Sequence, residues 1–301
     1  MNQHQFLEPN LFTDLILNTI EQTQEAREKS KARKTKLVIN FYESQSSDIK
    51  LLCLGTKHVY NIENQIIKEI KENFDTYKPD LVLVEGWFDL KDNETYKAKI
   101  RKSSLEKFDN PVEIESITKQ RGELGYAVML ASYNNIQIET LEPYWPLLKK
   151  DLMSSFEKEE FFLAQVIINL GIAYNRIKQN KKDFDLRKSY ENIATNIKMW
   201  MNDENFDYSY EHFLELKDKL LGQEFDISNQ DEIISYTKPY QNQRNIIDKV
   251  FTFESTLRDR VMFNVIKENL ESGKYRRIMI VSGGLHVLSQ EPALQKLFES
   301  I

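Results

Sequence analysis

The stretch LLCLGTKH, residues 51–58, carries an apolar run directly into a glycine and ends on a histidine. A short apolar run bounded by turn-forming residues is typical of a strand buried on both faces, and the glycine allows the chain to bend where the strand ends. A similar stretch, IMIVSGGLH, occupies residues 278–286. We therefore predict that His58 and His286 each lie just beyond the C-terminal end of a buried strand.

The residues around the first stretch predict alternating strands and helices. Residues 36–42 predict a strand that pairs with the 51–55 strand as a hairpin. Asn61 is the expected N-cap of a helix that carries apolar residues as far as Phe74, and residues 80–84 predict a strand that ends at Glu85. A strand–helix–strand unit of this kind has parallel strands, so His58 and Glu85 are expected on the same edge of a sheet.

The remaining elements extend this pattern towards the C-terminus. Residues 111–134 predict a helix in which Glu123 lies among small residues, and residues 136–141 predict a short strand followed by Glu142. A helix over residues 253–270 leads to the 278–281 strand, and Ser289 is the expected cap of the last helix. The predicted fold class is therefore α/β, with a mostly parallel central sheet flanked by helices.

Changes in composition and in apolar periodicity along the sequence divide the chain into four segments. Residues 1–35 predict an N-terminal helix and a basic tether, and residues 36–146 the first part of the α/β core. Residues 147–243 predict long amphipathic helices rich in Lys, Glu and Asn, which we interpret as a helical cap inserted over the crevice at the sheet edge. Residues 244–301 return to the α/β pattern and form the second part of the core.

Composition excludes several classes of partner. The net charge of -6 gives no global basic surface, so we expect no nucleic-acid partner, and no glycine-rich phosphate-binding fingerprint predicts a nucleotide cofactor. The single cysteine, Cys53, lies in a predicted strand, which fits a structural thiol in a reducing compartment. Without a secretory signal or a long apolar run, the chain is expected to be cytoplasmic and not bound to a membrane.

The predicted sheet edge collects side chains that can perform hydrolytic chemistry: His58, Glu85, Glu142 and His286, with Glu123 reaching it from a helix. Two imidazoles with carboxylates are the donor set that first-row divalent ions take, and such an ion lowers the pKa of bound water to about 7. The same residues without a metal could act as general acid and base. The sequence leaves both alternatives open.

Each of these residues also has an ordinary structural interpretation. A histidine after a strand often makes a single hydrogen bond, and a glutamate there often caps a helix or joins an ion pair. Arg258 and Asp259 border the apolar stripe of their helix, where they could form a solvated ion pair or clamp a substrate. Ser282 and Cys53 have no sequence neighbour that would make either a nucleophile, and His4 and His212 are expected at the surface.

Several short motifs together resemble the TraB/Tiki family. They are GTKH at 55–58, PDLVLVE at 79–85, RGE at 121–123, LEP at 141–143 and GGLH at 283–286. Arg258-Asp259 with Met262 is similar to the erythromycin-esterase branch of the same broader superfamily, which also includes ChaN-like proteins. The resemblance covers roughly residues 50–145 and 250–290, about half of the chain.

The resemblance implies an α/β fold in which two Gly-x-x-His loops and glutamates converge on one site. Tiki-like members are metal-dependent peptidases, whereas erythromycin esterases hydrolyse a macrolide lactone with no evident metal. Carried over by position, it implies a site that binds a divalent metal such as Mn, Co or Zn through His58, Glu85, Glu123, Glu142 and His286. Arg258 is added as a catalytic residue beside His58, Glu85 and His286.

We therefore expect a hydrolase that cleaves an amide or ester bond in a peptide or small-molecule substrate. Two alternatives remain. One is a metal-free esterase, and the other is a non-catalytic module that binds a ligand, or a protein partner through its N-terminal helix or cap.

Overall fold

The computed structural model describes residues 15–16, 25, 37–86, 111–142, 145–179, 184–236 and 245–301. The chain forms two compact units, one comprising Met1–Glu142 with Asp259–Ile301 and the other Pro143–Arg258. The segment predicted as a helical insertion, residues 147–243, falls inside the second unit. The helix and tether predicted for residues 1–35 lie outside the described residues, apart from three isolated positions.

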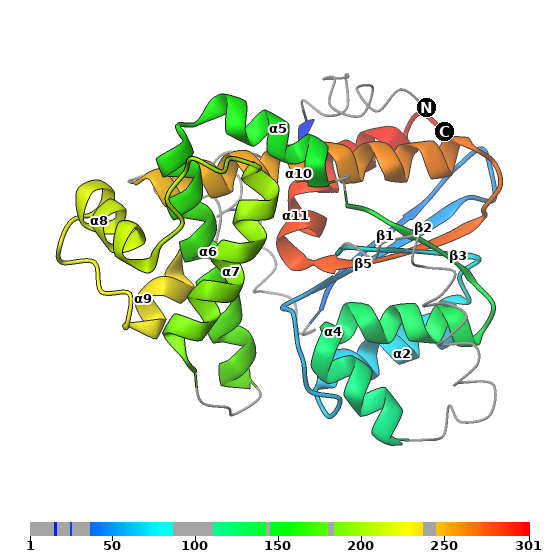
Figure 1. The fold of residues 1–301 in the computed structure, drawn as a ribbon. Coiled ribbons are helices and arrows are strands. Elements are labelled where there is room, and N and C mark those ends of the chain that lie inside the picture. The colour runs from blue at the N-terminus through cyan, green and yellow to red at the C-terminus, as the bar shows by residue number, and fades with distance from the viewer. Residues whose placement is uncertain are drawn as a thin grey trace. The chain divides into compact units, whose positions relative to one another are not determined.

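The first unit is built on a five-stranded sheet with the order β1-β2-β5-β3-β4 (Figure 1). Its strands are β1 (Val38–Glu43), β2 (Lys50–Thr56), β3 (Leu81–Val84), β4 (Gln137–Thr140) and β5 (Arg277–Gly283). β1 pairs antiparallel with β2, as the predicted hairpin requires, and the other three pairings are parallel. The α/β class is confirmed, and the sheet is mixed.

The last strand, β5, enters the centre of the sheet between β2 and β3. Its pairing places Gly283 level with Thr56 on β2, and Val281 level with Val84 on β3. Apolar residues fill both faces of these central strands, which explains why their sequences are continuously apolar rather than alternating. The three strands that precede His58, Glu85 and His286 therefore end side by side.

Helices cover both faces of the sheet (Figure 1). On one face, α2 (Gln65–Tyr77) and α4 (Pro111–Tyr133) pack on β2 side chains such as Leu52 and Leu54. On the other, α11 (Gly284–Phe298) and the part of α10 (Ile246–Glu271) that follows Arg258 pack on Leu51 and Cys53. Alternate residues of one strand point to opposite faces, so a single apolar strand serves both layers.

The two layers of helices follow from the direction in which the chain crosses the sheet. The connections through α2 and α4 both run towards β4, and the later connection that ends in α10 runs back to β5. Crossovers of one hand that run in opposite directions must lie on opposite faces. Consequently the chain leaves β2 towards one face and leaves β5 towards the other. This is a topological switch point, the kind of place where open α/β sheets commonly form ligand crevices.

Three predicted helix starts are wrong. The helix predicted over residues 253–270 begins earlier, at Ile246 of α10. The N-cap of α2 is Asn64, whose side chain accepts from Ile66 N, whereas Asn61 accepts from Glu63 N in the preceding turn. The last helix, α11, begins at Gly284, so Ser289 lies inside it and His286 lies in its first turn. Gly283 is the N-cap residue and has no side-chain cap; its own amide donates to the Glu85 carboxylate, which fixes the chain where the helix begins.

The helix predicted over residues 111–134 forms as α4 but is kinked at Gly122, where φ is 68°. A side chain at this position would also crowd the chain after β2, because a Cβ would lie 3.0 Å from Val59 O. Only glycine accommodates both the left-handed backbone and this close approach. The kink determines where the second half of α4 begins, and it therefore determines the position of Glu123.

The described part of the second unit is helical. Its elements are α5 (Trp145–Ser155), α6 (Lys158–Gln179), α7 (Leu186–Met201), α8 (Tyr210–Leu221), α9 (Gln230–Ser235) and the first part of α10. Its own apolar core contains aromatic residues that are almost fully buried, among them Phe161, Phe162 and Phe213. Within the described ranges of both units, no helix combines the length and apolar character needed to cross a bilayer.

Candidate functional site

His58 is oriented by Glu123 from α4. The Nδ1 atom of His58 lies 2.9 Å from Glu123 Oε1. The same carboxylate accepts hydrogen bonds from Thr56 Oγ1 at 2.6 Å and from Val59 N at 2.8 Å. Because Glu123 is only 1% exposed, these contacts form a buried anchor for residues 56–59. This carboxylate holds the His58 ring through Nδ1, and direct metal ligation by Glu123 stays a prediction.

The backbone of His58 is strained. Its φ of 53° lies in the left-handed region, which costs a residue other than glycine about 1 kcal/mol or more. The bonds from Thr56 and Val59 to Glu123 hold the loop in this conformation. The imidazole is thereby kept at the end of β2 with its side chain 41% exposed.

His286 is oriented in a similar way by Asp259 from α10. Its Nδ1 atom lies 2.7 Å from Asp259 Oδ1, and the Asp259 residue is 1% exposed. The sequence predicts Asp259 only as part of a solvated ion pair or as a substrate clamp. A signal for its inward position is nevertheless present, because the apolar Met262 and Phe263 follow it at helical spacing, and the structure buries both of them on the face that carries Asp259.

Glu85 lies between the two histidines. Its Oε1 is 3.4 Å from His286 Nε2, and its Oε2 is 4.0 Å from His58 Nε2. Gly283 N also donates to Oε2, so the backbone of β5 fixes this carboxylate at the strand ends. His58, Glu85 and His286 thus converge from distant positions as the sequence predicts, and contacts with Glu123 and Asp259 extend them to the series Glu123–His58–Glu85–His286–Asp259.

Two further glycines bring the histidine stretches together. A Cβ on Gly55 would lie 2.8 Å from Gly284 Cα, which is closer than atoms of this kind approach. The stretches therefore pack glycine against glycine where β2 ends and α11 begins. This contact explains why each histidine follows an apolar strand and a glycine.

The three carboxylates make both imidazoles more basic. For His58, burial opposes protonation, but the hydrogen bond to Glu123 and the charges of Glu85 and Glu123 outweigh it and raise the pKa to about 8. For His286, burial again opposes protonation, while the charges and hydrogen bonds of Asp259 and Glu85 raise the pKa to about 10. At neutral pH His286 is therefore an imidazolium, and His58 titrates closer to neutrality.

The donor types in this cluster suit a divalent metal. Both Nδ1 atoms are held by carboxylates, the usual arrangement behind metal-bound histidines, and both Nε2 atoms face Glu85. Donors of one ion lie about 3.0–3.5 Å apart, so the 3.4 Å between His286 and Glu85 fits and the 4.0 Å between His58 and Glu85 is wider. Among the described residues, no group of three or more His, Cys, Asp or Glu side chains is already arranged to hold an ion. The metal stays a prediction.

Glu142 and Arg258 are the two remaining predicted site residues. Glu142 is 7% exposed after the edge strand β4, and its backbone N donates to Thr140 Oγ1 at 3.1 Å. Arg258 is half-buried on α10 and is the last residue of the second unit. Metal ligation by Glu142 and a catalytic role for Arg258 stay predictions.

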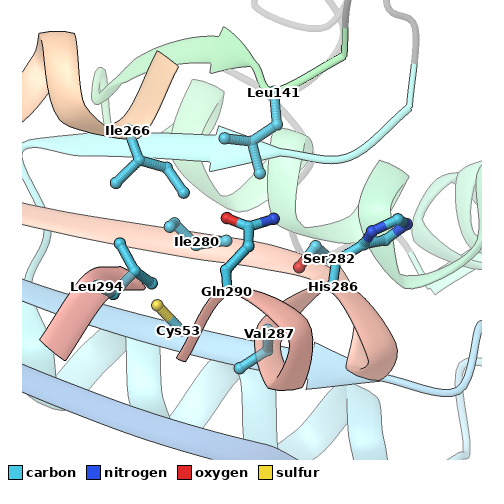
Figure 2. A pocket seen from close by; sticks show the side chains of 9 residues that line it. All are labelled: Cys53, Leu141, Ile266, Ile280, Ser282, His286, Val287, Gln290 and Leu294. Atoms are coloured by element: carbon cyan, nitrogen blue, oxygen red, sulfur yellow. The ribbon is translucent and has the colours of Figure 1, made fainter. Parts of the chain in front are cut away.

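A small, mostly apolar cavity adjoins the buried side of His286 (Figure 2). Its lining residues are Cys53, Leu141, Ile266, Ile280, Ser282, His286, Val287, Gln290 and Leu294. Apolar surroundings keep water from this side of the imidazole and strengthen its bond to Asp259. Burial also raises the pKa of the Cys53 thiol, which fits the structural role expected for it.

We expect the pH dependence of stability to report the His286 ion pairs. The folded pKa of about 10 exceeds the reference value of 6.5, so this stabilisation is complete below pH 6.5 and is lost as pH rises through about 10. His286 should lower the unfolding free energy by up to about 1.4 kcal/mol per pH unit within this window, and His58, with its pKa of about 8, adds to the fall below pH 8. Denaturant titrations of the metal-free protein between pH 8 and 10 isolate the His286 contribution. His286→Ala should flatten the slope there and His212→Ala should keep it, whereas an unchanged slope in His286→Ala would refute the assignment.

The chain matches no protein-family model, no curated protein and no solved structure. The functional argument therefore depends on the side chains that the fold brings together.

Proposed function

We propose that this protein is a hydrolase of the TraB/Tiki type that activates water at the His58–Glu85–His286 cluster and cleaves an amide or ester bond. The observation that carries the proposal is Glu85 shared between two histidines, each held at Nδ1 by its own buried carboxylate. Burying three carboxylates beside two imidazoles is costly, and no such cluster is needed to complete an α/β core. Perturbed groups gathered at the C-terminal ends of parallel strands favour a catalytic role.

The two histidines are suited to different tasks. His58 has the more exposed side chain and a pKa of about 8, so it can exchange protons with water near neutral pH. His286 is 11% exposed and remains protonated, so its positive charge can stabilise an anion that develops during hydrolysis. Glu85 lies next to both Nε2 atoms and can orient a water molecule between them.

A divalent metal would be held by His58 Nε2, His286 Nε2 and the Glu85 carboxylate. When bound, such an ion would supply a water molecule of lowered pKa and would polarise a carbonyl group. Glu123 and Asp259 would keep the two Nε2 atoms directed at the site, as they do in this structure. Metal binding requires neutral imidazoles, so it would compete with the protons that the carboxylates favour.

A hydrolysis assay on peptide and ester libraries tests the proposal. We expect turnover by the wild-type protein, loss of at least about a hundredfold in His58→Ala, and wild-type turnover in His212→Ala, a histidine of the second unit. Equal turnover in His58→Ala and the wild type would exclude this site. Absence of turnover in every form would instead favour the non-catalytic binding module.

Elemental analysis separates the metal-dependent and metal-free forms of the proposal. The wild type, His58→Ala and His286→Ala are dialysed against Mn, Co and Zn in turn. Near-stoichiometric metal that both substitutions abolish would support the metallohydrolase. Turnover without bound metal would support acid–base hydrolysis by the residues themselves.

A further inference from the structure

Gln290 lies one helical turn after His286 on α11 and is 3% exposed. Its Nε2 donates to Asp259 Oδ1 at 3.0 Å, the same oxygen that lies 2.7 Å from His286 Nδ1. Two donors on one helix therefore meet a single carboxylate oxygen of a neighbouring helix. Residues four positions apart lie on one helix face, so α11 presents both donors in a fixed relative position.

The surroundings of Gln290 do not otherwise call for an amide. Figure 2 shows its side chain among Leu141, Ile280 and Leu294, and its Nε2 also lies 3.7 Å from Met262 Sδ. Burying an amide in apolar surroundings is unfavourable unless its polar atoms are bonded, and a leucine or methionine would fill this space without that cost. The bond to Asp259 is the contact that accounts for a glutamine here.

We propose that Gln290 is a positioning residue, which fixes the Asp259 carboxylate and through it directs His286 Nε2 at Glu85. The bond from the His286 ring cannot by itself fix the carboxylate that is meant to orient that ring. The second donor, the Gln290 amide, is held by the backbone of α11 and restrains the carboxylate independently of the imidazole. A neutral amide does this without changing the charge of the cluster, so the ion pair between Asp259 and His286 is preserved.

This inference rests on the proposed hydrolase, and a pair of variants tests it in the full-length protein. Gln290→Met keeps the volume of the side chain and removes its donor. We expect kcat to fall about tenfold with little change in KM, because partners of this kind typically contribute 10–100-fold. Selective ¹⁵N labelling of the four histidines should show altered His286 ring signals.

The second unit offers a matched control. Gln165 is 2% exposed and donates to buried Glu254 at 2.8 Å, so Gln165→Leu also breaks a buried glutamine–carboxylate bond. It should lower stability while leaving the His286 ring signals unchanged. If Gln290→Met and Gln165→Leu lowered kcat equally and neither changed these signals, the positioning role would be refuted. Two outcomes separate this inference from the proposed function. If His58→Ala lost turnover while Gln290→Met kept its kcat and its ring signals, only the positioning role would be overturned. If His58→Ala kept full turnover, the proposed function would be overturned.

Discussion

Gly283→Ala is expected to abolish turnover while leaving the fold intact. The backbone at Gly283 has φ of -58° and ψ of 140°, which alanine adopts freely. A Cβ there would lie 3.1 Å from both Glu85 Oε2 and His58 Nε2, and 3.5 Å from His286 Cδ2. The added methyl group would therefore occupy the space between the groups that we propose activate water. A misplacement of about 1 Å at a catalytic centre can reduce the rate about a hundredfold, and we expect at least this loss.

The Gly283 prediction is checked by steady-state kinetics together with thermal unfolding. Ser282→Ala is the matched control. Ser282 directly precedes Gly283 on β5 and therefore points to the opposite face of the strand, where it is 2% exposed. We expect it to retain most of the activity. A Gly283→Ala protein with wild-type turnover would show that the space beside Gly283 is not used in the reaction.

The second large effect is expected from Glu123→Ala, which should reduce both stability and activity. The substitution removes the acceptor for Thr56 Oγ1, His58 Nδ1 and Val59 N, and leaves these donors without it in a buried region. Loss of one partner from a buried charged network costs about 3–5 kcal/mol. The His58 loop would also lose the bonds that maintain its left-handed backbone, so turnover should fall in the fraction that remains folded.

Denaturant unfolding measures this cost. Glu115→Ala is a suitable control, because Glu115 lies on the same helix and its side chain, 44% exposed, forms an ion pair with Lys119 across one turn. Such a pair contributes about 0.3–0.5 kcal/mol. If Glu123→Ala destabilised the protein no more than Glu115→Ala, Glu123 would not be the anchor of the loop that its contacts indicate.

The local sequence pattern was sufficient to predict the elements that bury apolar side chains. The continuous apolar runs before Gly55 and Gly283 predicted two strands buried on both faces, and both lie at the centre of the sheet. Helix starts were harder to locate. The competing Asn61 and Asn64 both suit an N-cap, and α11 starts without a side-chain cap at Gly283, whose amide donates to the distant carboxylate of Glu85.

The partners of the two histidines could not be chosen from sequence. The bonds that the Glu123 carboxylate accepts from the 56–59 stretch depend on the Gly122 kink, which turns α4 towards Val59, whereas metal ligation by Glu123 stays a prediction. Asp259 and Gln290 come from different helices and meet only because α10 and α11 pack on the same face of the sheet. Such contacts depend on which helices are neighbours, and the apolar pattern of one helix does not specify its neighbour.

The sequence by itself determined that this chain forms an α/β fold whose strand ends carry His58, Glu85 and His286, since apolar periodicity and glycines act locally. Only the tertiary structure decided that Glu85 lies between both imidazoles, that each ring is held by its own carboxylate, and that Gly283 leaves a space beside them. The physical reason is that pKa values and steric space arise from groups brought together across the chain, and their distances are set by the packing of whole elements.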